Sequence, residues 1–326
     1  MSDTTQFQNL IFDVSNVFHR AYHASQASSP SGESVEGVSK TAIQSFFNIL
    51  RRVEKEFLEP GGTCWFLFDN SSSGENRRKE IDPGYKADRK PKDVEINSTI
   101  DALHFLLLHY SDSYCVVKKE GKEADDLVKP VLETLQSGTQ AVVSNDLDWA
   151  QNIADSTLWI RYRTQDQAYE VLNREDFREE HGFYPDGNNL LMFKAVRGDS
   201  SDGIPVSVPR LPRETLLYIT QTYGDPESLL QNLKEDERIS DLWKERIREN
   251  NPRLRLNFKL VSPDPVGEAE FWDSVYRSEF SPRVLYNLYR YLGIKISSFD
   301  PRVMSFFPQP EVSTDNFFGF RKTPRA

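Results

Sequence analysis

The sequence predicts an α/β fold in which a mainly parallel, twisted sheet with flanking helices precedes a helical region. Up to about residue 172, short apolar runs rich in β-branched and aromatic residues alternate with segments of helical periodicity. Beyond that point the strand signals fade. In addition, acidic residues stand directly after three of the apolar runs, at the ends of the strands that these runs predict.

The first 172 residues alternate predicted strands with predicted helices. Apolar runs of strand length indicate the strands, and apolar residues three or four positions apart indicate the helices. In chain order we expect a strand at 9–15, a helix to about Ala27, a helix from Val38 to Leu58, a strand at 64–68, a helix at 94–110, a strand at 114–117, a helix at 123–136, a strand at 140–144 and, after a short helix, a strand at 157–162. This order is typical of a doubly wound sheet.

The remainder of the chain has a different character. Helices are expected at 190–196, 214–223, 241–250 and 283–293. From about Pro308 the sequence is rich in Pro, Ser and Thr, which is typical of a tail. We therefore expect an α/β core at 1–172, a helical region at 173–307 and a C-terminal tail at 308–326. The helical region either stands apart or packs on the sheet as part of one globule.

Nine acidic residues in five short, turn-like segments are the candidate metal ligands. They are Asp13 in LIFDVSN, Asp69 in FLFDN, Glu123, Asp125 and Asp126 in GKEADD, Asp146 and Asp148 in VVSNDLDW, and Asp199 and Asp202 in RGDSSDGIP. Residues just past the carboxyl ends of parallel strands converge on one crevice. Carboxylates gathered there repel one another unless cations neutralise them, and without His or Cys they suit Mg²⁺ or Mn²⁺. The pattern predicts a two-metal site that cleaves phosphodiesters.

Each acidic group taken alone has an ordinary structural explanation. Asp13 and Asp69 also fit turn or helix N-cap positions, and the acids of GKEADD also fit the first turn of a helix. The D-x-D at 146–148 and the glycine-flanked turn at 198–203 are less typical of plain connections. The order of all five groups relative to the strands favours a single site.

Composition is compatible with a nucleic-acid substrate. The 326 residues carry a formal net charge of −10, which by itself disfavours a polyanionic partner. Without the nine candidate ligands, 41 acidic residues face 40 Lys and Arg, so the rest of the chain is almost neutral. The only two cysteines, Cys64 and Cys115, lie in apolar runs and are expected to be buried thiols. No signal-peptide or membrane-spanning pattern is visible, and we expect a monomer in the cytoplasm.

The connection after Asp69 is unusually long and becomes basic. It runs for about 24 residues to Asp93, longer than the ~12–15 residues beyond which loops in compact domains are usually functional or disordered. Within 77–92, seven basic residues face three acidic ones. The basic residues are Arg77, Arg78, Lys79, Lys86, Arg89, Lys90 and Lys92. A solvated loop is one explanation, and contact with phosphates, with Tyr85 as a stacking platform, is the other.

The order of these segments, together with RKEIDPGYKADRK, resembles the 5′-nuclease (flap endonuclease) superfamily over about residues 9–215. This superfamily includes the 5′→3′ exonuclease domain of bacterial DNA polymerase I. The length and the C-terminal half are most similar to phage enzymes historically called RNase H, for which the location would be the host cytoplasm. The resemblance implies a PIN-like core and a structure-selective 5′ nuclease that removes RNA primers and 5′ flaps from branched or nicked DNA during replication. It also implies two Mg²⁺ ions, replaceable by Mn²⁺, held by all nine acids.

The resemblance further implies roles for the basic segment. Residues 70–95 would form an arch through which a single 5′ strand passes. Within it, Lys86 and Arg89 would contact the scissile phosphate as catalytic residues. The expected DNA contacts nearby are Arg77, Arg78, Lys79, Tyr85 and Lys90.

One departure from the family pattern lies after Asp202. Relatives continue into a glycine-rich helical hairpin, of the helix–three-turn–helix type, whose backbone amides grip duplex DNA. Here Arg210 and Pro212 stand where glycines are expected. Because proline lacks the N–H donor, we expect side-chain phosphate contacts from Arg210 and Arg213 instead.

The tail and the remaining function classes complete the expectations. Phe317, Phe318 and Phe320 make the tail either a segment that docks on its own surface or an anchor for a sliding clamp or single-strand-binding protein. A non-catalytic branched-DNA-binding factor is the alternative function. A dehalogenase-type phosphatase is disfavoured, because Val14-Ser15 follows Asp13 without the second aspartate. Without a glycine-rich nucleotide loop, ATP or NAD binding is not expected.

Overall fold

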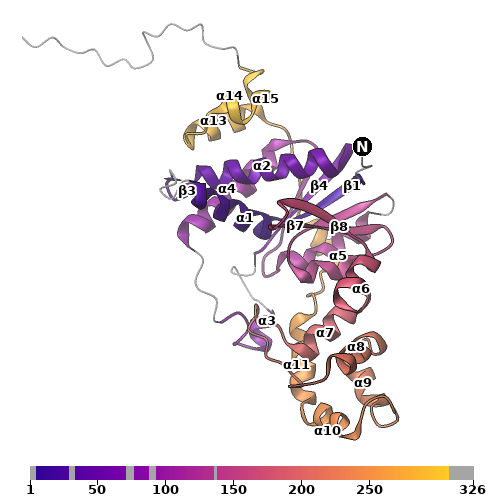
Figure 1. Ribbon diagram of the computed structural model, residues 1–326. Helices are drawn as coiled ribbons and strands as arrows, with labels where there is room; N and C mark the ends of the chain where they lie inside the picture. Colours follow the sequence, from indigo (N-terminus) through magenta and orange to yellow (C-terminus); the bar gives the residue numbers. More distant parts are fainter. Residues whose placement is uncertain (1–4, 29–33, 71–76, 88–92, 136–137, 308–326) are drawn as a thin grey trace, which may run out of the picture.

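The structure, a computed structural model, describes residues 5–28, 34–70, 77–87, 93–135 and 138–307 (Figure 1). The strands are β1 (Phe7–Asp13), β2 (Ser34–Val35), β3 (Val38–Ser39), β4 (Leu58–Phe68), β5 (Tyr114–Lys118), β6 (Gln140–Val143), β7 (Thr157–Arg163), β8 (Ala168–Leu172) and β9 (Val275–Arg277). The helices of the first part are α1 (Val14–Ser28), α2 (Lys40–Phe57), α3 (Arg77–Ile81), α4 (Val94–Tyr110), α5 (Ala124–Thr134) and the 3₁₀ helix η1 (Leu147–Asn152). Those of the second part are α6 (Arg174–His181), α7 (Asn189–Arg197), α8 (Arg213–Thr222), α9 (Pro226–Asn232), α10 (Asp241–Glu249), α11 (Asn251–Val261), α12 (Glu268–Trp272), α13 (Pro282–Tyr291), α14 (Ile296–Phe299) and α15 (Pro301–Met304).

A seven-stranded sheet in the order β8-β7-β6-β1-β4-β5-β9 organises the molecule. The five strands from β7 to β5 run parallel, and the edge strands β8 and β9 are antiparallel to their neighbours. The chain passes to β4 on one side of β1 and later to β6 on the other, so β1 is the point where the strand order reverses. Ligands bind beside such a point in open α/β sheets, at the carboxyl ends of the strands.

Helices cover both faces of the sheet, and the side chains of the central strands alternate between two cores. Phe12, Phe66 and Val116 face the helices α1, α2 and α4. Ile11 and Leu67 face the other way, toward α5, η1 and α6. Because both faces are buried, these strands have nearly continuous apolar sequences, and this is why the sequence pattern located them.

The chain after α6 divides between two places (Figure 1). Helices α7 to α11 enclose a core of their own, with Met192, Ile219 and Leu254 among its buried residues. The chain then returns to the sheet: β9 pairs with β5, and Leu285 and Tyr289 of α13 belong to the core beneath α2 and α4. The helical region therefore includes one lobe of its own and one segment that packs on the sheet.

The predicted mainly parallel α/β sheet is confirmed, and most predicted elements occur within a few residues of their expected ends. Strand β9 lies in the part of the chain where the strand signals fade, and it was not predicted because its three residues carry no readable alternation. Helix α3 was also missed, since its five residues lie in a segment with a loop-like composition. Cys64 and Cys115 are buried free thiols, as expected.

Several expectations concern residues outside the described ranges. They include the tail with its phenylalanines and the arch residues Arg89 and Lys90. Among the helices of the described residues, none is long and apolar enough to cross a lipid bilayer.

Candidate metal centre

Four neighbouring parallel strands deliver acidic residues to the same edge of the sheet. Asp13 is the last residue of β1, and Asp69 directly follows β4. Asp146 lies three residues after β6, and Glu123 precedes α5, the helix that follows β5. Because these strands are parallel and adjacent, their carboxyl ends bring the four side chains together. This is the arrangement that the sequence predicted.

Asp13 sits at the bottom of the site and is almost completely buried. Its carboxylate accepts a hydrogen bond from the backbone N–H of Asn16 at 3.0 Å and from the hydroxyl of Ser144 at 2.7 Å. Burial raises the pKa of Asp13 to about 7, and the negative charges of Asp69 and Asp146 add to this effect. A bound cation would offset both causes.

The amino end of α5 carries three acidic residues in three different situations. Glu123 and Asp126 form a capping box, in which each side chain accepts from the other residue's backbone N–H. The Asp125 side chain is partly buried, and its buried Oδ1 atom accepts no hydrogen bond from the described residues. Burial raises the pKa of Asp125. Asp69 joins this group by accepting from the backbone N–H of Ala124 at 2.9 Å.

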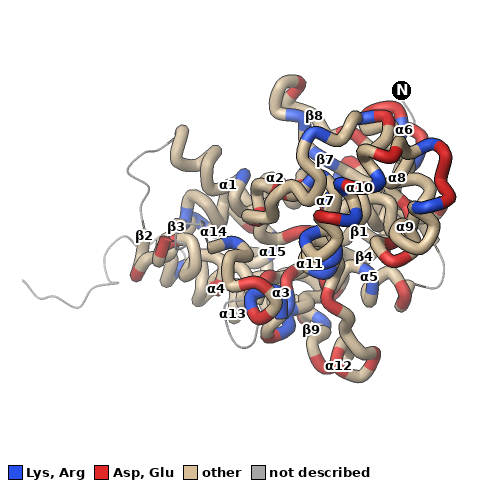
Figure 2. The backbone as a smooth tube through the Cα atoms, turned by 90° about the horizontal axis from the view of Figure 1, so that it is seen from below, with Lys and Arg blue, Asp and Glu red and all other residues tan. Residues whose placement is uncertain are grey.

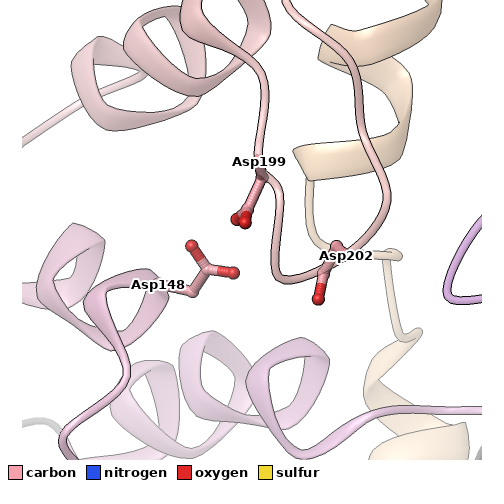
Figure 3. A group of neighbouring side chains, drawn as sticks. All are labelled: Asp148, Asp199 and Asp202. Atoms are coloured by element: carbon pink, nitrogen blue, oxygen red, sulfur yellow. The ribbon is translucent and has the colours of Figure 1, made fainter. Parts of the chain in front are cut away.

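Asp148, Asp199 and Asp202 form a second acidic group (Figure 3). One oxygen of each lies within 4.8 Å of the others. Lys194 of α7 pairs with Asp148 and also with Asp199, at 2.6 Å to the latter. Burial and the charge of Asp146 outweigh the Lys194 pair and raise the pKa of Asp148 to about 6. For Asp199 burial acts the same way, yet Lys194 prevails and lowers the pKa.

The turn that holds Asp199 and Asp202 depends on a glycine. Asp199 and Ile204 exchange two backbone hydrogen bonds of 2.8 Å, which close the turn at 199–204. Gly198 has φ of 77°, and a Cβ atom there would lie 2.6 Å from the backbone of Ile204, Pro205 and Val206. Any side chain at 198 would therefore displace the turn and both aspartates.

Seven of the nine predicted ligands line one cavity of about 200 Å³. They are Asp13, Asp69, Glu123, Asp125, Asp146, Asp148 and Asp202. Asp199 lies beside this cavity through its group with Asp148, whereas Asp126 points into a buried ion-pair network. A cavity lined by carboxylate oxygens, with a buried Asp125 oxygen that lacks a hydrogen-bond donor, fits hard divalent cations.

Three side chains of the arch segment meet at one oxygen of the site. Glu123 Oε2 lies 2.7 Å from Lys86 Nζ, 3.2 Å from the Tyr85 hydroxyl and 3.3 Å from Arg78 Nη1. Lys86 and Tyr85 also reach Asp202. Burial opposes the charge on Lys86, but Glu123 and Asp202 raise its pKa above the usual value. The described part of segment 70–95 thus contacts the acidic residues, and its Lys86 lines the cavity.

The predicted DNA-contacting residues are distributed unevenly. Arg78 and Tyr85 are buried, so in this conformation neither presents a solvent-facing surface to a phosphate or a base. Arg77 pairs with Asp264 at 3.2 Å, and Lys79 is exposed. Arg210 is exposed too. Arg213 opens α8 and donates to the carbonyl of His181 at 3.0 Å.

Two residues that contact the aspartates of the site, Lys194 and Ser144, were not predicted from the sequence. Lys194 interrupts the apolar run of α7, and a buried lysine in such a run is a signal for a charged partner. Ser144, the donor to Asp13, directly follows β6 and carries no such signal, because serine is common after strands.

Comparison with known proteins identifies relatives of the chain. Residues 8–182, just over half of its length, match the 5′-3′ exonuclease N-terminal resolvase-like domain. The chain is 25% identical to flap endonuclease Xni of Photobacterium profundum over 256 residues, 78% of this chain and 90% of the relative. It is 24% identical to a 5′-3′ exonuclease of Buchnera aphidicola over 232 residues, 69% of this chain and 70% of the relative.

Solved structures of the bacteriophage T5 enzyme share the fold. The T5 5′-exonuclease with bound zinc matches with a TM-score of 0.58 and 18% identity, covering 78% of this chain and 89% of that one. A variant of the T5 flap endonuclease in a pseudo-enzyme–product complex with DNA and metal ions matches with a TM-score of 0.55 and 15% identity, covering 91% and 98%.

Proposed function

The chain belongs to the 5′-3′ exonuclease family, and from this membership we propose that it is a structure-selective, metal-dependent 5′ nuclease. Its substrates are branched or nicked duplex DNA with a 5′ flap or an RNA primer, as removed during replication. The observation that carries the proposal is the cavity in which seven carboxylates from four strand ends and one turn face a cationic arch segment.

Relatives support the substrate class. Both Xni and the T5 enzyme are named flap endonucleases, and the T5 variant was solved with DNA and metal ions. In this chain the cationic groups lie where a phosphate that approaches the acidic cavity needs counter-charges. Lys86 is the described example, with Nζ 2.7 Å from a site carboxylate.

The cofactor of this proposal is a pair of Mg²⁺ ions, for which Mn²⁺ can substitute. The described side chains that line the cavity include seven carboxylates, one lysine, Lys86, and one histidine, His19. Divalent cations supply an activated water and stabilise charge on the phosphate and the leaving oxygen. The chain's own contribution is to hold Asp13 and Asp148 in place before a cation arrives, through the backbone N–H of Asn16 and the ammonium group of Lys194.

Lys86 is the proposed catalytic residue of the arch. Its backbone has φ of 53°, a left-handed conformation that is costly for a side-chain-bearing residue and is typical of functional sites. The backbone N–H of Lys86 donates to the Asp202 carbonyl at 2.9 Å, which fixes the arch turn on the acidic turn. When substrate binds, its ammonium group can leave a carboxylate partner and contact the scissile phosphate instead. Arg89 keeps its proposed role of contacting the scissile phosphate.

The duplex is proposed to lie along the helical lobe. Arg210 stands where relatives have glycine, and it keeps the left-handed backbone that glycine would adopt, with φ of 65°. The hairpin α7–α8 therefore retains its path while offering two guanidinium groups, those of Arg210 and Arg213. Arg77, Arg255 and Lys259 line a groove beside α3 and α11 and add positive charge there. Figure 2 colours the basic positions of both helices blue.

Cleavage of a 5′-labelled flap substrate tests the proposed function. With Mg²⁺ we expect cleavage near the branch, and with EDTA none. The Asp146→Asn/Asp148→Asn variant should bind the flap in the presence of Ca²⁺ yet cut at least roughly a thousandfold more slowly. Cleavage without metal, or full activity in the double variant, would contradict the proposed metal-dependent mechanism. Flap binding without cutting by the wild-type protein would favour the non-catalytic branched-DNA factor.

Salt-dependent duplex binding tests the hairpin. If Arg210 and Arg213 contact phosphates, each Ala variant should reduce the slope of log affinity against log salt by about 1. Arg238→Ala, an exposed change elsewhere in the lobe, serves as the matched control. Unchanged slopes in the Arg210 and Arg213 variants would remove these residues from the interface.

The tail gives a separate partner proposal. Its phenylalanines are proposed to bind a sliding clamp or a single-strand-binding protein, because exposed aromatic residues on a tail act as peptide anchors. Deletion of 308–326 should abolish co-purification with the purified partner and leave flap cleavage unchanged. Partner binding that survives the deletion would contradict this role.

A further inference from the structure

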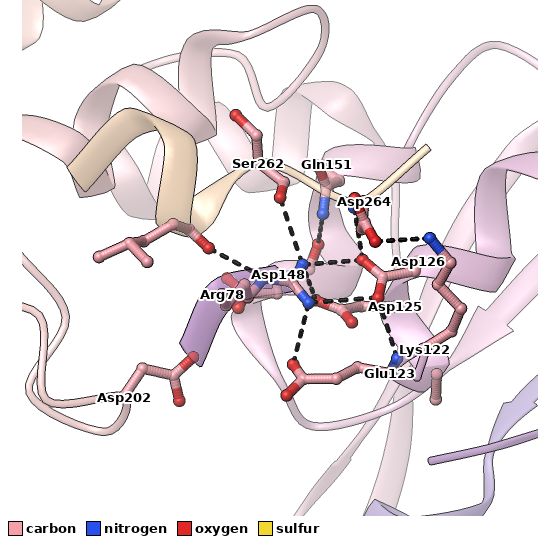
Figure 4. A network of polar contacts seen from close by, with 12 residues as sticks. Arg78, Lys122, Glu123, Asp125, Asp126, Asp148, Gln151, Asp202, Ser262 and Asp264 are labelled. Atoms are coloured by element: carbon pink, nitrogen blue, oxygen red, sulfur yellow. Dashed lines mark hydrogen bonds and ion pairs between the residues drawn. The ribbon is translucent and has the colours of Figure 1, made fainter. Parts of the chain in front are cut away.

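The side chain of Arg78 lies inside the acidic cluster instead of on the arch surface (Figure 4). It is 4% exposed. Its guanidinium contacts three carboxylates: Asp126 at 2.8 Å, Glu123 at 3.3 Å and Asp125 at 3.7 Å. A buried arginine with this many anionic partners has a specific structural task, because a desolvated charge is costly unless it is paired.

The carboxylate of Asp126 is completely occupied by donors. Oδ1 accepts from Arg78 Nη2 at 2.8 Å and from the backbone N–H of Asp264 at 2.6 Å. Oδ2 accepts from Arg78 Nη1 at 3.2 Å and from the backbone N–H of Glu123 at 2.9 Å. A carboxylate offers about four lone-pair positions, so these four hydrogen bonds leave none for a cation. Among the three acids at the start of α5, Asp125 and Glu123 line the cavity and Asp126 does not.

Arg78 also reaches the end of α11. Its Nε donates to the carbonyl of Leu260 at 3.0 Å, and Nη2 donates to that of Ser262 at 3.3 Å. Carbonyls at the carboxyl end of a helix lack partners within the helix and carry partial negative charge, so they favour a cation. One guanidinium therefore joins α3 at the arch base, the acidic end of α5 and the last turn of α11.

We propose that Arg78 is a positioning residue that holds the arch base, the metal-binding end of α5 and the helical lobe in fixed positions relative to one another. Asp126 is then the carboxylate that anchors Arg78 instead of a direct metal ligand. The proposal rests on the proposed nuclease function for its catalytic consequence. Its structural part stands on the contacts alone. Lys86 differs from Arg78 in this respect, because both of its carboxylate partners line the cavity, whereas the shortest ion pair of Arg78 is with Asp126, which does not.

The first test uses Arg78→Met and Arg78→Lys, with Arg52→Met as the control. Arg52 is half-exposed on α2, where it pairs loosely with Glu56 at 4.0 Å, donates to the Gln167 carbonyl at 3.1 Å and lies over the Tyr169 ring. Without metal, Arg78→Met should lower Tm by about 5–10 °C, because three carboxylates lose a buried cation. Added Mn²⁺ should raise Tm more in this variant than in the wild type, because the vacated carboxylates bind the ion. Arg52→Met should match the wild type in both measurements.

The second readout is kinetic. In Arg78→Met, kcat for flap cleavage should fall about 10- to 100-fold with little change in KM, because the site is displaced while the DNA surface remains. Compared with Arg78→Met, Arg78→Lys should restore part of the loss in Tm but little of the loss in kcat. An ammonium group cannot reach both Asp126 oxygens and the Leu260 carbonyl at once. This variant carries the test if Arg78→Met does not fold.

The third readout separates anchor from ligand. Asp126→Asn should bind as many Mn²⁺ ions as the wild type in electron paramagnetic resonance titrations, whereas Asp148→Asn should bind fewer. Equal losses of Mn²⁺ in the two variants would overturn the assignment of Asp126. Two results for Arg78→Met would overturn the role of Arg78 as a positioning residue. One is a raised KM at constant kcat, and the other is a lower Tm with an unchanged response of Tm to Mn²⁺. Because Tm and Mn²⁺ binding need no nuclease assay, an inactive wild-type protein would contradict the proposed function without deciding this inference.

Discussion

The two sides of the acidic cavity are held by different kinds of partner. On the strand side, Asp13, Asp69 and Asp146 accept hydrogen bonds from backbone N–H groups, and Asp13 also from a hydroxyl. On the helix side, carboxylates pair with the cations of three side chains, Arg78, Lys86 and Lys194. Neutral donors orient a carboxylate without cancelling its charge, whereas ammonium and guanidinium groups do both.

This difference assigns separate tasks to the two sides. Burial raises the pKa of Asp13, and the charges of Asp69 and Asp146 add to this effect, which indicates that the hydrogen-bond donors of the strand side leave its negative charge largely uncompensated. That side therefore has the greater need for an added cation. The helix side is partly neutralised by the chain itself, because Arg78, Lys86 and Lys194 pair with its carboxylates. It therefore needs an added cation less in order to fold into its final shape. Disturbing each side should consequently have opposite effects on stability.

The largest expected effect comes from Asp13→Asn on the strand side. Flap cleavage should fall roughly a thousandfold, because a metal-facing carboxylate is lost. The Tm of the metal-free protein should rise, since a buried and repelled carboxylate is replaced by a neutral group of equal size. Differential scanning calorimetry in EDTA measures the second effect. A lower Tm would contradict the uncompensated state of this side.

Lys194→Met on the helix side should have the opposite effect on stability. Removing one partner of a buried ion pair costs about 3–5 kcal/mol, because Asp148 and Asp199 are left near each other without their cation. The loss should appear in urea unfolding of the metal-free protein, and Mn²⁺ should restore part of it. Lys129→Met, which removes an exposed i, i+4 pair with Glu133, should change stability by less than about 0.5 kcal/mol.

The smallest effect is the pH dependence of the metal-free protein. The folded-state pKa of Asp13, about 7, lies above its ordinary value of 3.8, so the folded state binds more protons between these limits. Stability should therefore fall as pH rises from 4 to 7 and level off above 7. Between pH 5 and pH 7 the ionisation of Asp13 should lower the free energy of unfolding by about 2 kcal/mol.

Asp13→Asn provides the control for this pH effect. Its unfolding free energy should depend less steeply on pH between 5 and 7 than that of the wild-type protein, while Asp148, with a pKa of about 6, accounts for a remaining slope. Identical slopes in the two proteins would place the titrating group elsewhere. Saturating Mg²⁺ should remove most of the difference, because a bound cation opposes protonation.

Hydropathy and motif order in the sequence determined the sheet and the location of the acids. Strands buried on both faces require apolar runs, and parallel strands place whatever follows them at one edge. Hence Asp13, Asp69 and Asp146 were predicted together and lie together. The strand β9 was not predictable, because its three residues depend on pairing with β5 for their conformation.

Only the tertiary structure decided what each charged side chain does. The sequence marks Arg78 as one of seven basic residues in a loop and Asp126 as one of nine acids, with no sign that they satisfy each other. Their pairing requires α3, the start of α5 and the end of α11 to meet, although the residues in contact lie as many as 184 positions apart along the chain. Local sequence encodes strands and turns through short-range preferences, whereas the partner of a charge is set by which distant segments pack against it.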